Sequence, residues 1–298
     1  MINKLEMLIA LAREKHFGRA AASLGIAQPT LSSGIKQLED QLGAQLVRRG
    51  SRFGGLTPEG QRALEHARRI CEGARRMRAE LRPSDKGLSG RLRLAVIPTA
   101  LTWAARLATT LEARHPNIAL TILSRSSREI RDMMEAFDVD AGLTYLSDPA
   151  DAAPGDDQAR PLYAERYAIL CARSHPAAAM DAARWADLGD LRLCLLTPDM
   201  QNRRIIDRNF REAGAVPGAR IESNSTVALA AIVQEGGWAT ILPRDMCAWL
   251  AQGKDLAAIP VEGGAPPPPV GLVAPRQDPP SPVLEALFAA ADRIAETR

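Results

Sequence analysis

Cysteine and histidine are both scarce in this 298-residue chain, and their scarcity excludes several kinds of site. Each occurs four times, and no two cysteines form a Cys-x-x-Cys pair. Scattered thiols are typical of reduced, buried side chains rather than of a disulfide framework or a zinc site. The histidines also lack the spacing of metal ligands. We therefore expect neither a metal nor a cofactor. The residues are Cys71, Cys171, Cys194 and Cys247, and His16, His66, His115 and His175.

Long apolar runs and the common motifs of enzymes are missing too. No apolar stretch approaches the roughly 18 residues that a membrane span needs. The first residues show no long apolar run with a small-residue cleavage site. These absences predict a cytoplasmic protein. The sequence also has no Gly-x-Ser-x-Gly elbow, no Gly-x-Gly-x-x-Gly turn and no glycine-rich phosphate loop ending in Gly-Lys-Ser/Thr. We expect no catalytic residues and no enzymatic activity.

The net charge is small, but it is unevenly distributed. The whole chain carries a formal charge of +3. Residues 1–82 contain 15 Lys and Arg against 8 Asp and Glu, a net charge of +7, which leaves −4 for the remainder. A basic N-terminal part indicates contact with phosphates. A solvated charged face would give the same count, so charge alone does not decide between the two.

The region from residue 17 to 60 has the pattern of a helix-turn-helix. An amphipathic helix is predicted over residues 2–14, and a second helix over 19–24 that stops at Gly25. A third helix is predicted to begin near Gln28-Pro29. Its apolar stripe leaves short polar side chains and one cation on the other faces, which suits them to DNA bases and phosphates. An ordinary hydrated helix face is the alternative. The stripe is Leu31, Ile35, Leu38 and Leu42.

A wing and a long helix are predicted to follow. Arginines around Gly54-Gly55 favour a β-ribbon that lies on the phosphate backbone. Thr57-Pro58-Glu59 then predicts the start of a helix that runs to about Arg82. Small and apolar residues on this helix recur with a heptad-like spacing, which favours pairing with a second copy of the chain. Packing against its own domain is the alternative. The seam is Ala63, Ala67, Ile70, Ala74, Met77 and Leu81.

These residues together resemble the LysR-type transcriptional regulators. The matching positions are Phe17, Ala20, Ala21, Gln28-Pro29, Ser32, Ile35 to Glu39, Leu42-Gly43, Arg49, and Leu56-Thr57 with Gly60. Two positions depart from the family pattern. His16 stands where a serine is usual, which puts one phosphate contact in question, and Val47 stands where a phenylalanine is usual, which should change only packing.

The resemblance implies an N-terminal all-α winged helix-turn-helix with a long linker helix. It also implies promoter DNA as the partner, and a homodimer that assembles to a homotetramer. The DNA-facing residues that it implies are Arg19, Gln28, Pro29, Thr30, Ser32, Ser33, Lys36, Arg49 and Arg52.

Beyond residue 87 the pattern alternates between strands and helices, which predicts an α/β fold with a largely parallel sheet. Two long links, 148–161 and 263–269, predict two lobes. The resemblance implies the same two-lobe, periplasmic-binding-protein-like effector domain. Strands are predicted at 92–97, 118–123, 139–145, 167–172, 193–196, 239–242 and 270–274, and helices at 101–114, 126–137, 202–213, 226–235 and 282–296. The expected domains are 1–57, 58–87 and 88–298, with lobe 1 at about 88–161 and 267–298 and lobe 2 at about 162–266.

Hydroxyl residues recur where predicted strands give way to helices. Such turns hold small ligands in α/β folds, because helix N-termini present unpaired N–H groups. Simple helix capping is the alternative, and Ser126 with Glu129 forms a capping box. Arg203 and Arg204 are expected at the solvated surface. The candidate effector-binding residues are Pro98, Thr99, Ser126, Ser127, Thr197, Gln201, Ser225 and Thr226.

Contacts of this kind favour a small organic acid as the effector. The run from Leu196 to Arg204 is similar to family members encoded beside formate dehydrogenase operons, which implies formate as the first candidate. We therefore expect a DNA-binding transcriptional regulator that responds to a small carboxylate. An α/β enzyme with an appended DNA-binding head is the alternative. A solute-binding transport protein would need an export signal and would not need the first 60 residues.

Overall fold

The computed structural model describes residues 1–48, 53–80, 87–146, 157–276 and 281–296. The chain divides into two compact units, Met1–Asp85 and Lys86–Arg298. Each unit has a hydrophobic core of its own.

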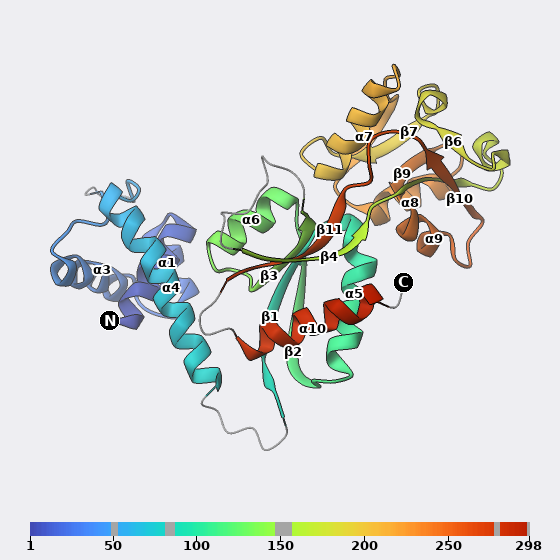
Figure 1. The fold of residues 1–298 in the computed structure, drawn as a ribbon. Helices are drawn as coiled ribbons and strands as arrows, with labels where there is room; N and C mark the ends of the chain where they lie inside the picture. Colours follow the sequence, from blue (N-terminus) through green and yellow to red (C-terminus); the bar gives the residue numbers. More distant parts are fainter. Residues whose placement is uncertain (49–52, 81–86, 147–156, 277–280, 297–298) are drawn as a thin grey trace. The chain divides into compact units, whose positions relative to one another are not determined.

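The first unit is helical, as expected (Figure 1). A short wing lies between its third and fourth helices, where Val47 and Leu56 form an isolated antiparallel bridge. The Arg48 backbone N–H donates to the Gly55 carbonyl at 3.0 Å, which closes the same turn. The helices are α1 (Ile2–Glu14), α2 (Phe17–Ser23), α3 (Gln28–Leu42) and α4 (Pro58–Glu80).

The stripe predicted for α3 is buried except at its end. Leu31, Ile35 and Leu38 are at most 3% exposed, whereas Leu42 is 46% exposed. The helix stops at Leu42, and Gly43 adopts a left-handed conformation with φ 64°. The last turn therefore leaves the core, and the prediction that Leu42 is buried was wrong.

The seam predicted on α4 divides between two faces. Ala67 is fully buried together with Leu64 and Cys71, and these residues belong to the core of their own unit. Ile70 and Met77 are 47% and 53% exposed. The prediction that Ala67 faces a second copy was therefore wrong, because α1 packs against this side of α4. Leu81 lies outside the described residues.

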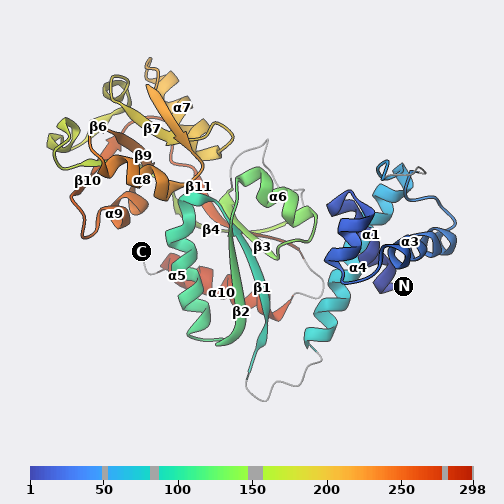
Figure 2. The same ribbon diagram turned by 180° about the vertical axis from the view of Figure 1, so that it is seen from behind.

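The second unit contains two sheets with helices packed against them (Figures 1 and 2). In the first sheet the strand order is β2-β1-β3-β11-β4. Helix α6 packs against β3 and β1, while α5 and α10 pack against each other. The elements are β1 (Ser89–Val96), α5 (Leu101–Glu112), β2 (Asn117–Ser124), α6 (Ser127–Glu135), β3 (Ala141–Tyr145), β4 (Asp157–Ala164), β11 (Pro269–Pro275) and α10 (Pro282–Glu296), with a short 3-10 turn at Pro98–Ala100.

The second sheet has the strand order β6-β10-β5-β9-β7-β8. Its central strands are fully buried: every residue of β7 and β9 is inaccessible or nearly so. The elements are β5 (Tyr167–Ala172), β6 (Ala183–Arg184), β7 (Leu193–Leu196), α7 (Gln201–Glu212), β8 (Ala219–Ser223), α8 (Thr226–Gln234), β9 (Ala239–Pro243), α9 (Arg244–Ala251) and β10 (Leu256–Glu262), with 3-10 turns at Pro176–Ala179 and Trp185–Leu188.

The chain crosses between the sheets twice, and the crossings make both sheets mixed. The outward crossing is only Glu165 and Arg166, between β4 and β5. The return runs through residues 263–268. Strand β11 is antiparallel to β3 and β4, and β5 is antiparallel to β9 and β10. The expectation of a largely parallel sheet was therefore too simple, because strands that arrive from the other lobe run against their neighbours. The residue limits predicted above for domains and lobes remain a prediction.

The return crossing is bonded to the second lobe. Trp185 Nε1 donates to the Gly263 carbonyl at 3.2 Å, and the Ala265 backbone N–H donates to Asn209 Oδ1 at 2.8 Å. Gly263 and Gly264 have φ values of 75° and 84°, in the left-handed region that favours glycine. The crossing is thus held on the side of the second sheet.

Candidate functional site

The exposed face of α3 carries polar side chains that the sequence assigned to DNA. With Leu31, Ile35 and Leu38 buried, the other faces of the helix are open to solvent. Hydroxyl, amide and ammonium groups on such a face can bond to base edges and phosphates. The Gln37 side-chain amide donates to Ser33 Oγ at 3.3 Å. The exposed candidates on this helix are Gln28, Pro29, Thr30, Ser32, Ser33 and Lys36.

His16 caps the N-terminus of α2. Its Nδ1 accepts hydrogen bonds from the backbone N–H groups of Gly18 at 3.0 Å and Arg19 at 3.3 Å. A serine hydroxyl would fill the same position, so the departure from the family pattern preserves the cap. Arg19 itself is exposed, and its Nη2 donates to the Glu14 carbonyl at 2.7 Å.

Glu39 supports the wing rather than the DNA-facing surface. Its Oε1 accepts from the backbone N–H groups of Leu46 at 2.7 Å and Val47 at 3.0 Å. A carboxylate that accepts two backbone bonds fixes the entry to the wing. Arg48 is exposed beyond this point. Arg49 and Arg52 lie outside the described residues, so their DNA contact remains a prediction.

Thr57 and Gly60 join the wing to α4. Thr57 Oγ1 donates to the Gln45 carbonyl at 2.5 Å and accepts from the Gly60 backbone N–H at 2.9 Å. A Cβ atom at Gly60 would overlap the carbonyl group of Leu46. The Leu-Thr-x-x-Gly pattern therefore reflects close packing of backbone against backbone.

A small cavity lies in the second unit between residues of the two lobes. It measures about 10 Å³ as the space open to the centre of a water molecule, which is room for about one water. Its walls come from the ends of β1, β3 and β7 and from the starts of α6 and α7, where ligands of α/β folds commonly bind. The lining residues are Ile97, Pro98, Thr99, Ser126, Ser127, Tyr145, Leu196, Met200, Gln201 and Asn202.

The structure brings together some of the predicted effector residues and not others. Pro98, Thr99, Ser126, Ser127 and Gln201 line the cavity. The remaining predicted residues, Thr197, Ser225 and Thr226, are not among its lining residues.

Two of the predicted hydroxyls are helix caps. Ser225 Oγ accepts from the Ala228 backbone N–H at 3.3 Å. Ser126 both lines the cavity and caps α6, since its Oγ donates to Glu129 Oε2 at 2.8 Å and accepts from the Glu129 backbone N–H at 3.3 Å. The capping alternative therefore applies to both, and the effector role of each remains a prediction.

A buried carboxylate that the sequence reasoning missed lies directly behind the cavity wall. Glu165 is 1% exposed and sits in the outward crossing. Its Oε1 accepts hydrogen bonds from the Tyr145 hydroxyl at 2.5 Å, the Tyr167 hydroxyl at 3.0 Å and the Asn202 amide at 3.2 Å. Tyr145 comes from lobe 1 and Asn202 from lobe 2, so this carboxylate joins the two lobes. No sequence motif marks the site, because two of its three partners, Tyr145 and Asn202, lie 20 and 37 residues away along the chain.

Burial dominates the titration of this cluster. Loss of water raises the pKa of Glu165, and the hydrogen bonds from Tyr145, Tyr167 and Asn202 partly oppose that shift. Burial and the nearby Glu165 charge also raise the pKa of Tyr145 well above its usual value. The tyrosine hydroxyls therefore keep their protons and act as donors to the carboxylate.

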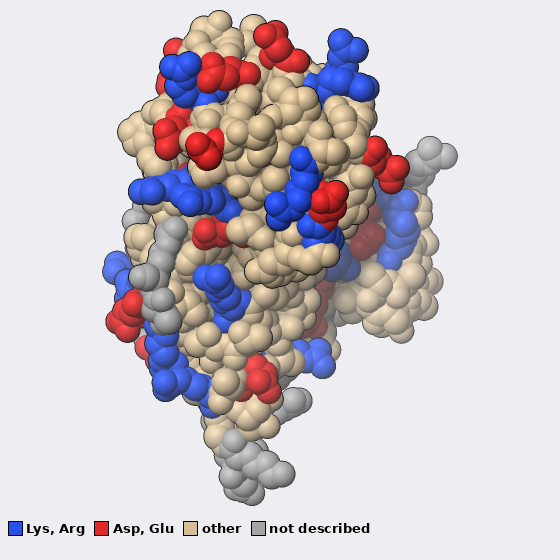
Figure 3. Space-filling view, turned by 90° about the vertical axis from the view of Figure 1, so that its right-hand side faces the viewer, with Lys and Arg blue, Asp and Glu red and all other residues tan. Residues whose placement is uncertain are grey.

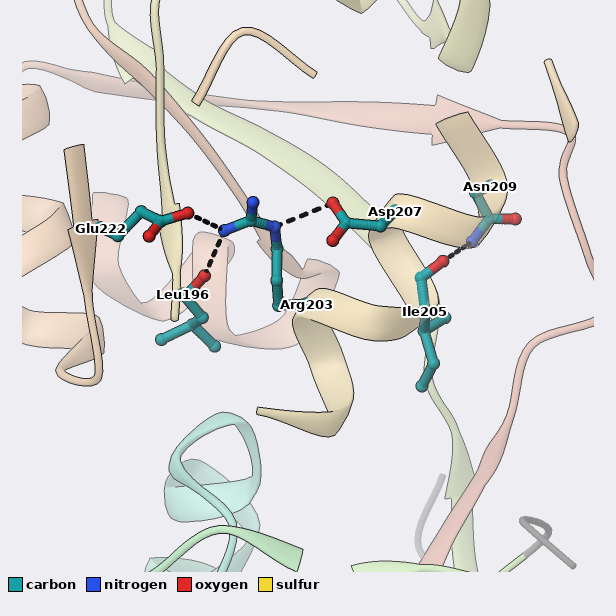
Figure 4. A network of polar contacts seen from close by, with 6 residues as sticks. All are labelled: Leu196, Arg203, Ile205, Asp207, Asn209 and Glu222. Atoms are coloured by element: carbon teal, nitrogen blue, oxygen red, sulfur yellow. Dashed lines mark hydrogen bonds and ion pairs between the residues drawn. The ribbon is translucent and has the colours of Figure 1, made fainter. Parts of the chain in front are cut away.

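Arg203 anchors the start of α7 to the neighbouring strands (Figure 4). Its Nη1 donates to the Leu196 carbonyl at 2.8 Å and to Glu222 Oε1 at 2.7 Å, and its Nε donates to Asp207 Oδ1 at 2.8 Å. The residue is 8% exposed. The expectation that Arg203 is solvated was wrong, because three acceptors compensate its buried charge.

All four cysteines are buried thiols that form no disulfide. Burial raises the pKa of the Cys194 thiol to about 11 and that of the Cys247 thiol to about 12. Thiols of this kind hold little thiolate near neutral pH and react slowly with oxidants and electrophiles.

Within the described part of the chain, no group of three or more Cys, His, Asp or Glu side chains is arranged to hold a metal ion. No helix in that part combines the length and apolarity needed to cross a membrane. Acidic and basic side chains are interspersed over the face drawn in Figure 3.

Comparison with protein families gives two matches that together span most of the chain. Residues 2–61 match the family described as bacterial regulatory helix-turn-helix protein, lysR family. Residues 85–295 match the family described as LysR substrate binding domain.

Individual proteins show the same likeness. A probable hydrogen peroxide-inducible genes activator of Mycobacterium xenopi is 32% identical over 173 residues, which cover 58% of this chain and 89% of that protein. A full-length OxyR variant from Pseudomonas aeruginosa superposes with a TM-score of 0.73 at 27% identity, over 99% of this chain and 94% of that one. Full-length CbnR in complex with its target DNA has a TM-score of 0.68 at 21% identity, over 99% of both chains, and shows likeness of fold.

Proposed function

This chain belongs to the LysR family of transcriptional regulators, and on that premise we propose how it reads DNA and how it senses a small molecule. In our proposal α3 enters the major groove of promoter DNA, and the cavity between the lobes binds a small effector. The observation that carries the first part is the α3 surface, where polar candidates are exposed while the apolar stripe is buried.

Ser32 and Ser33 are proposed to contact the DNA directly, with Gln28 and Thr30 beside them. Their short side chains on an exposed helix match direct readout of base edges and phosphates. Arg19, Pro29 and Lys36, together with Arg49 and Arg52 of the wing region, complete the proposed contact set. The net charge of +7 on residues 1–82 supports a phosphate-dominated interaction that weakens with salt.

The cavity is proposed as the effector site because residues from both lobes line it. A ligand held there would favour one relative orientation of the lobes, provided that it binds the two orientations with different affinity. Thr99 is the proposed probe of this site, since it is 2% exposed and lines the cavity.

Formate, or another small carboxylate, is the effector suggested by the sequence, and it stays a hypothesis. The names of similar proteins suggest hydrogen peroxide instead. A peroxide signal read through a reactive thiolate is disfavoured in this chain, because its four cysteines are buried and burial raises the pKa of Cys171, Cys194 and Cys247. We therefore propose a small effector that binds non-covalently.

We favour a regulator over the enzyme alternative because the chain belongs to a family of transcriptional regulators. The residues that line the cavity include no histidine, lysine or cysteine that could act as a base or nucleophile beside the serines. Assembly is proposed to proceed through α4 to a homodimer and then a homotetramer, with Ile70 and Met77 as the exposed apolar residues on that helix.

A reciprocal pair of variants tests the division of roles. The double variant Ser32→Ala, Ser33→Ala should bind a DNA fragment from the promoter region of its own gene about tenfold more weakly, or worse. Its thermal stability should change little. Fluorescence anisotropy at fixed salt measures the affinity, and Ser124→Ala, an exposed serine on β2, is the matched control. Thr99→Val should leave this affinity unchanged and abolish the response to effector. Equal damage to both activities by both variants would contradict the proposal.

A further inference from the structure

The polar groups of the cavity wall are already oriented by the carboxylate behind them. Two wall residues, Tyr145 and Asn202, donate hydrogen bonds to Glu165. The Tyr145 hydroxyl donates its only hydrogen to Glu165 Oε1 at 2.5 Å. The Asn202 amide nitrogen donates to the same oxygen at 3.2 Å and lies 3.5 Å from the Tyr145 hydroxyl oxygen. These donors are therefore directed away from the cavity.

The orientation of Asn202 follows from the same contact. Reversal of the amide would place its carbonyl oxygen against the carboxylate oxygen, two acceptors at hydrogen-bonding distance. The amide nitrogen therefore faces Glu165, and Oδ1 faces elsewhere. Among the described residues Asn202 Oδ1 and Glu165 Oε2 are buried and have no hydrogen-bond partner. Both atoms accept hydrogen bonds, and a buried acceptor without a partner is costly.

Ser126 adds another acceptor to the cavity wall. Ser126 gives its hydrogen to Glu129 Oε2 at 2.8 Å, so its oxygen also acts as an acceptor. The remaining side-chain donors of the wall are few. Thr99 Oγ1 and Ser127 Oγ are buried without a partner in the described chain and can donate. Gln201 Oε1 accepts from Arg204 Nε at 3.0 Å.

We propose that Glu165 converts one side of the effector site into a hydrogen-bond-accepting wall, and that the effector therefore presents N–H donors there, as an amide or amidinium group does, and is not a bare carboxylate. This inference rests on the proposed role of the cavity as the effector site. Glu165 acts as a positioning residue: it orients Tyr145 and Asn202, and they contact the ligand. A carboxylate has only acceptors, so it would meet acceptors on the side of the wall that Tyr145 and Asn202 form.

The size of the cavity limits the ligand further. Its 10 Å³ has room for about one water, so a group of three heavy atoms requires a small separation of the lobes. Asn202 and Tyr145 lie on opposite lobes and share Glu165, so the same ligand that satisfies Asn202 Oδ1 acts on the joint between the lobes. Selection of the ligand and movement of the lobes are thus coupled through one carboxylate.

Three ligands of nearly identical shape test the proposal: formamidinium, formamide and formate. Each has three heavy atoms, and they differ in charge and in the number of donors. Thermal shift and isothermal titration of the full chain at constant ionic strength measure binding, with dissociation constants in the millimolar range expected for such small ligands. Formamide and formamidinium should each bind about tenfold or more tightly than formate.

Glu165→Gln provides the variant test. A glutamine at this position can donate where the carboxylate only accepts, so Asn202 can reverse and present its nitrogen to the cavity. The variant should lose the preference over formate, while Glu235→Gln, which removes the same charge from an exposed position in the same lobe, should keep it. The order of the three dissociation constants in the unaltered chain tests the inference even if Glu165→Gln folds poorly.

Formate binding as tightly as formamide, or no binding by any of the three, would overturn the inference. DNA affinity measured on the same sample separates a failure of this inference from a failure of the proposed function. Retained DNA binding with the wrong ligand ranking rejects only the accepting wall. Loss of both DNA binding and ligand binding in a folded sample rejects the proposed function itself.

Discussion

On α3 the polar side chains proposed to meet DNA are exposed, whereas those around the cavity are buried and hydrogen-bonded to one another. The difference follows from the partner that each surface meets. A recognition surface for DNA keeps its donors and acceptors hydrated until a large partner replaces the water. A site for a ligand of a few atoms must fix its few polar groups in advance, because a small ligand supplies little energy to orient them.

The exposed surface of α3 and the buried cluster should respond differently to mutation. Polar residues of the exposed surface should be replaceable with loss of DNA binding and little loss of stability. Polar residues of the buried cluster should contribute to folding and to ligand selection together. Three stability measurements, together with the binding experiments above, test how strictly this separation holds.

The largest effect is expected from removal of the buried carboxylate. Glu165→Ala leaves two tyrosine hydroxyls and the Asn202 amide buried without their acceptor, so the free energy of unfolding should fall by about 2–5 kcal/mol. Urea unfolding followed by circular dichroism measures it. Glu235→Ala, at an exposed position, should stay within about 0.5 kcal/mol of the parent. A loss below about 1 kcal/mol for Glu165→Ala would show that the cluster does not support the fold.

A smaller loss is expected at the junction of the wing and α4. Gly60→Ala places a methyl group against the Leu46 carbonyl, and overpacking of this kind costs about 1–3 kcal/mol. Gly73→Ala is the matched control, because a Cβ there meets no atom within 4 Å and alanine favours the helix. Thermal unfolding should therefore move in opposite directions for the two variants. Equal melting temperatures would refute the close backbone contact.

The smallest effect is expected at the cap of α2. His16→Ala removes the acceptor for two backbone N–H groups and should lower the free energy of unfolding by about 0.5–2 kcal/mol. His16→Ser restores an acceptor in the same place and should recover most of this loss. Denaturant unfolding of the three proteins side by side measures the difference. Equal losses for Ala and Ser would mean that His16 acts through something other than the cap.

The sequence predicts the elements of this fold well where a pattern is local. The strands and helices with continuous apolar runs or strong caps were all found, including the capping box at Ser126. Strands β4, β6, β8 and β10 and helix α9 were missed, because polar residues, prolines or a very short length obscure their patterns. Strand β8, for example, alternates half-buried and exposed residues at the edge of its sheet.

The candidate site was predicted only in part, for a physical reason. Thr99, Ser126 and Gln201 stand at predicted strand-to-helix turns, so their gathering at one cavity follows from topology. Glu165 lies in a two-residue crossing without a helix or strand of its own, and its burial depends on partners far along the chain. Arg203 was placed in solvent because two of its three acceptors, the Leu196 carbonyl and Glu222, lie on other elements, and only Asp207 lies on the same helix. Long-range compensation of buried charge leaves no local signature.

The two connections between the sheets differ in length and in the contacts that hold them. One is a dipeptide whose first residue holds both lobes through its side chain, and the other is a glycine-containing strap bonded to Trp185 and Asn209. The two connections are also joined to each other, because the Glu165 backbone N–H donates to the Pro268 carbonyl at 2.9 Å. A change in the hydrogen bonds of Glu165 therefore acts where both connections meet.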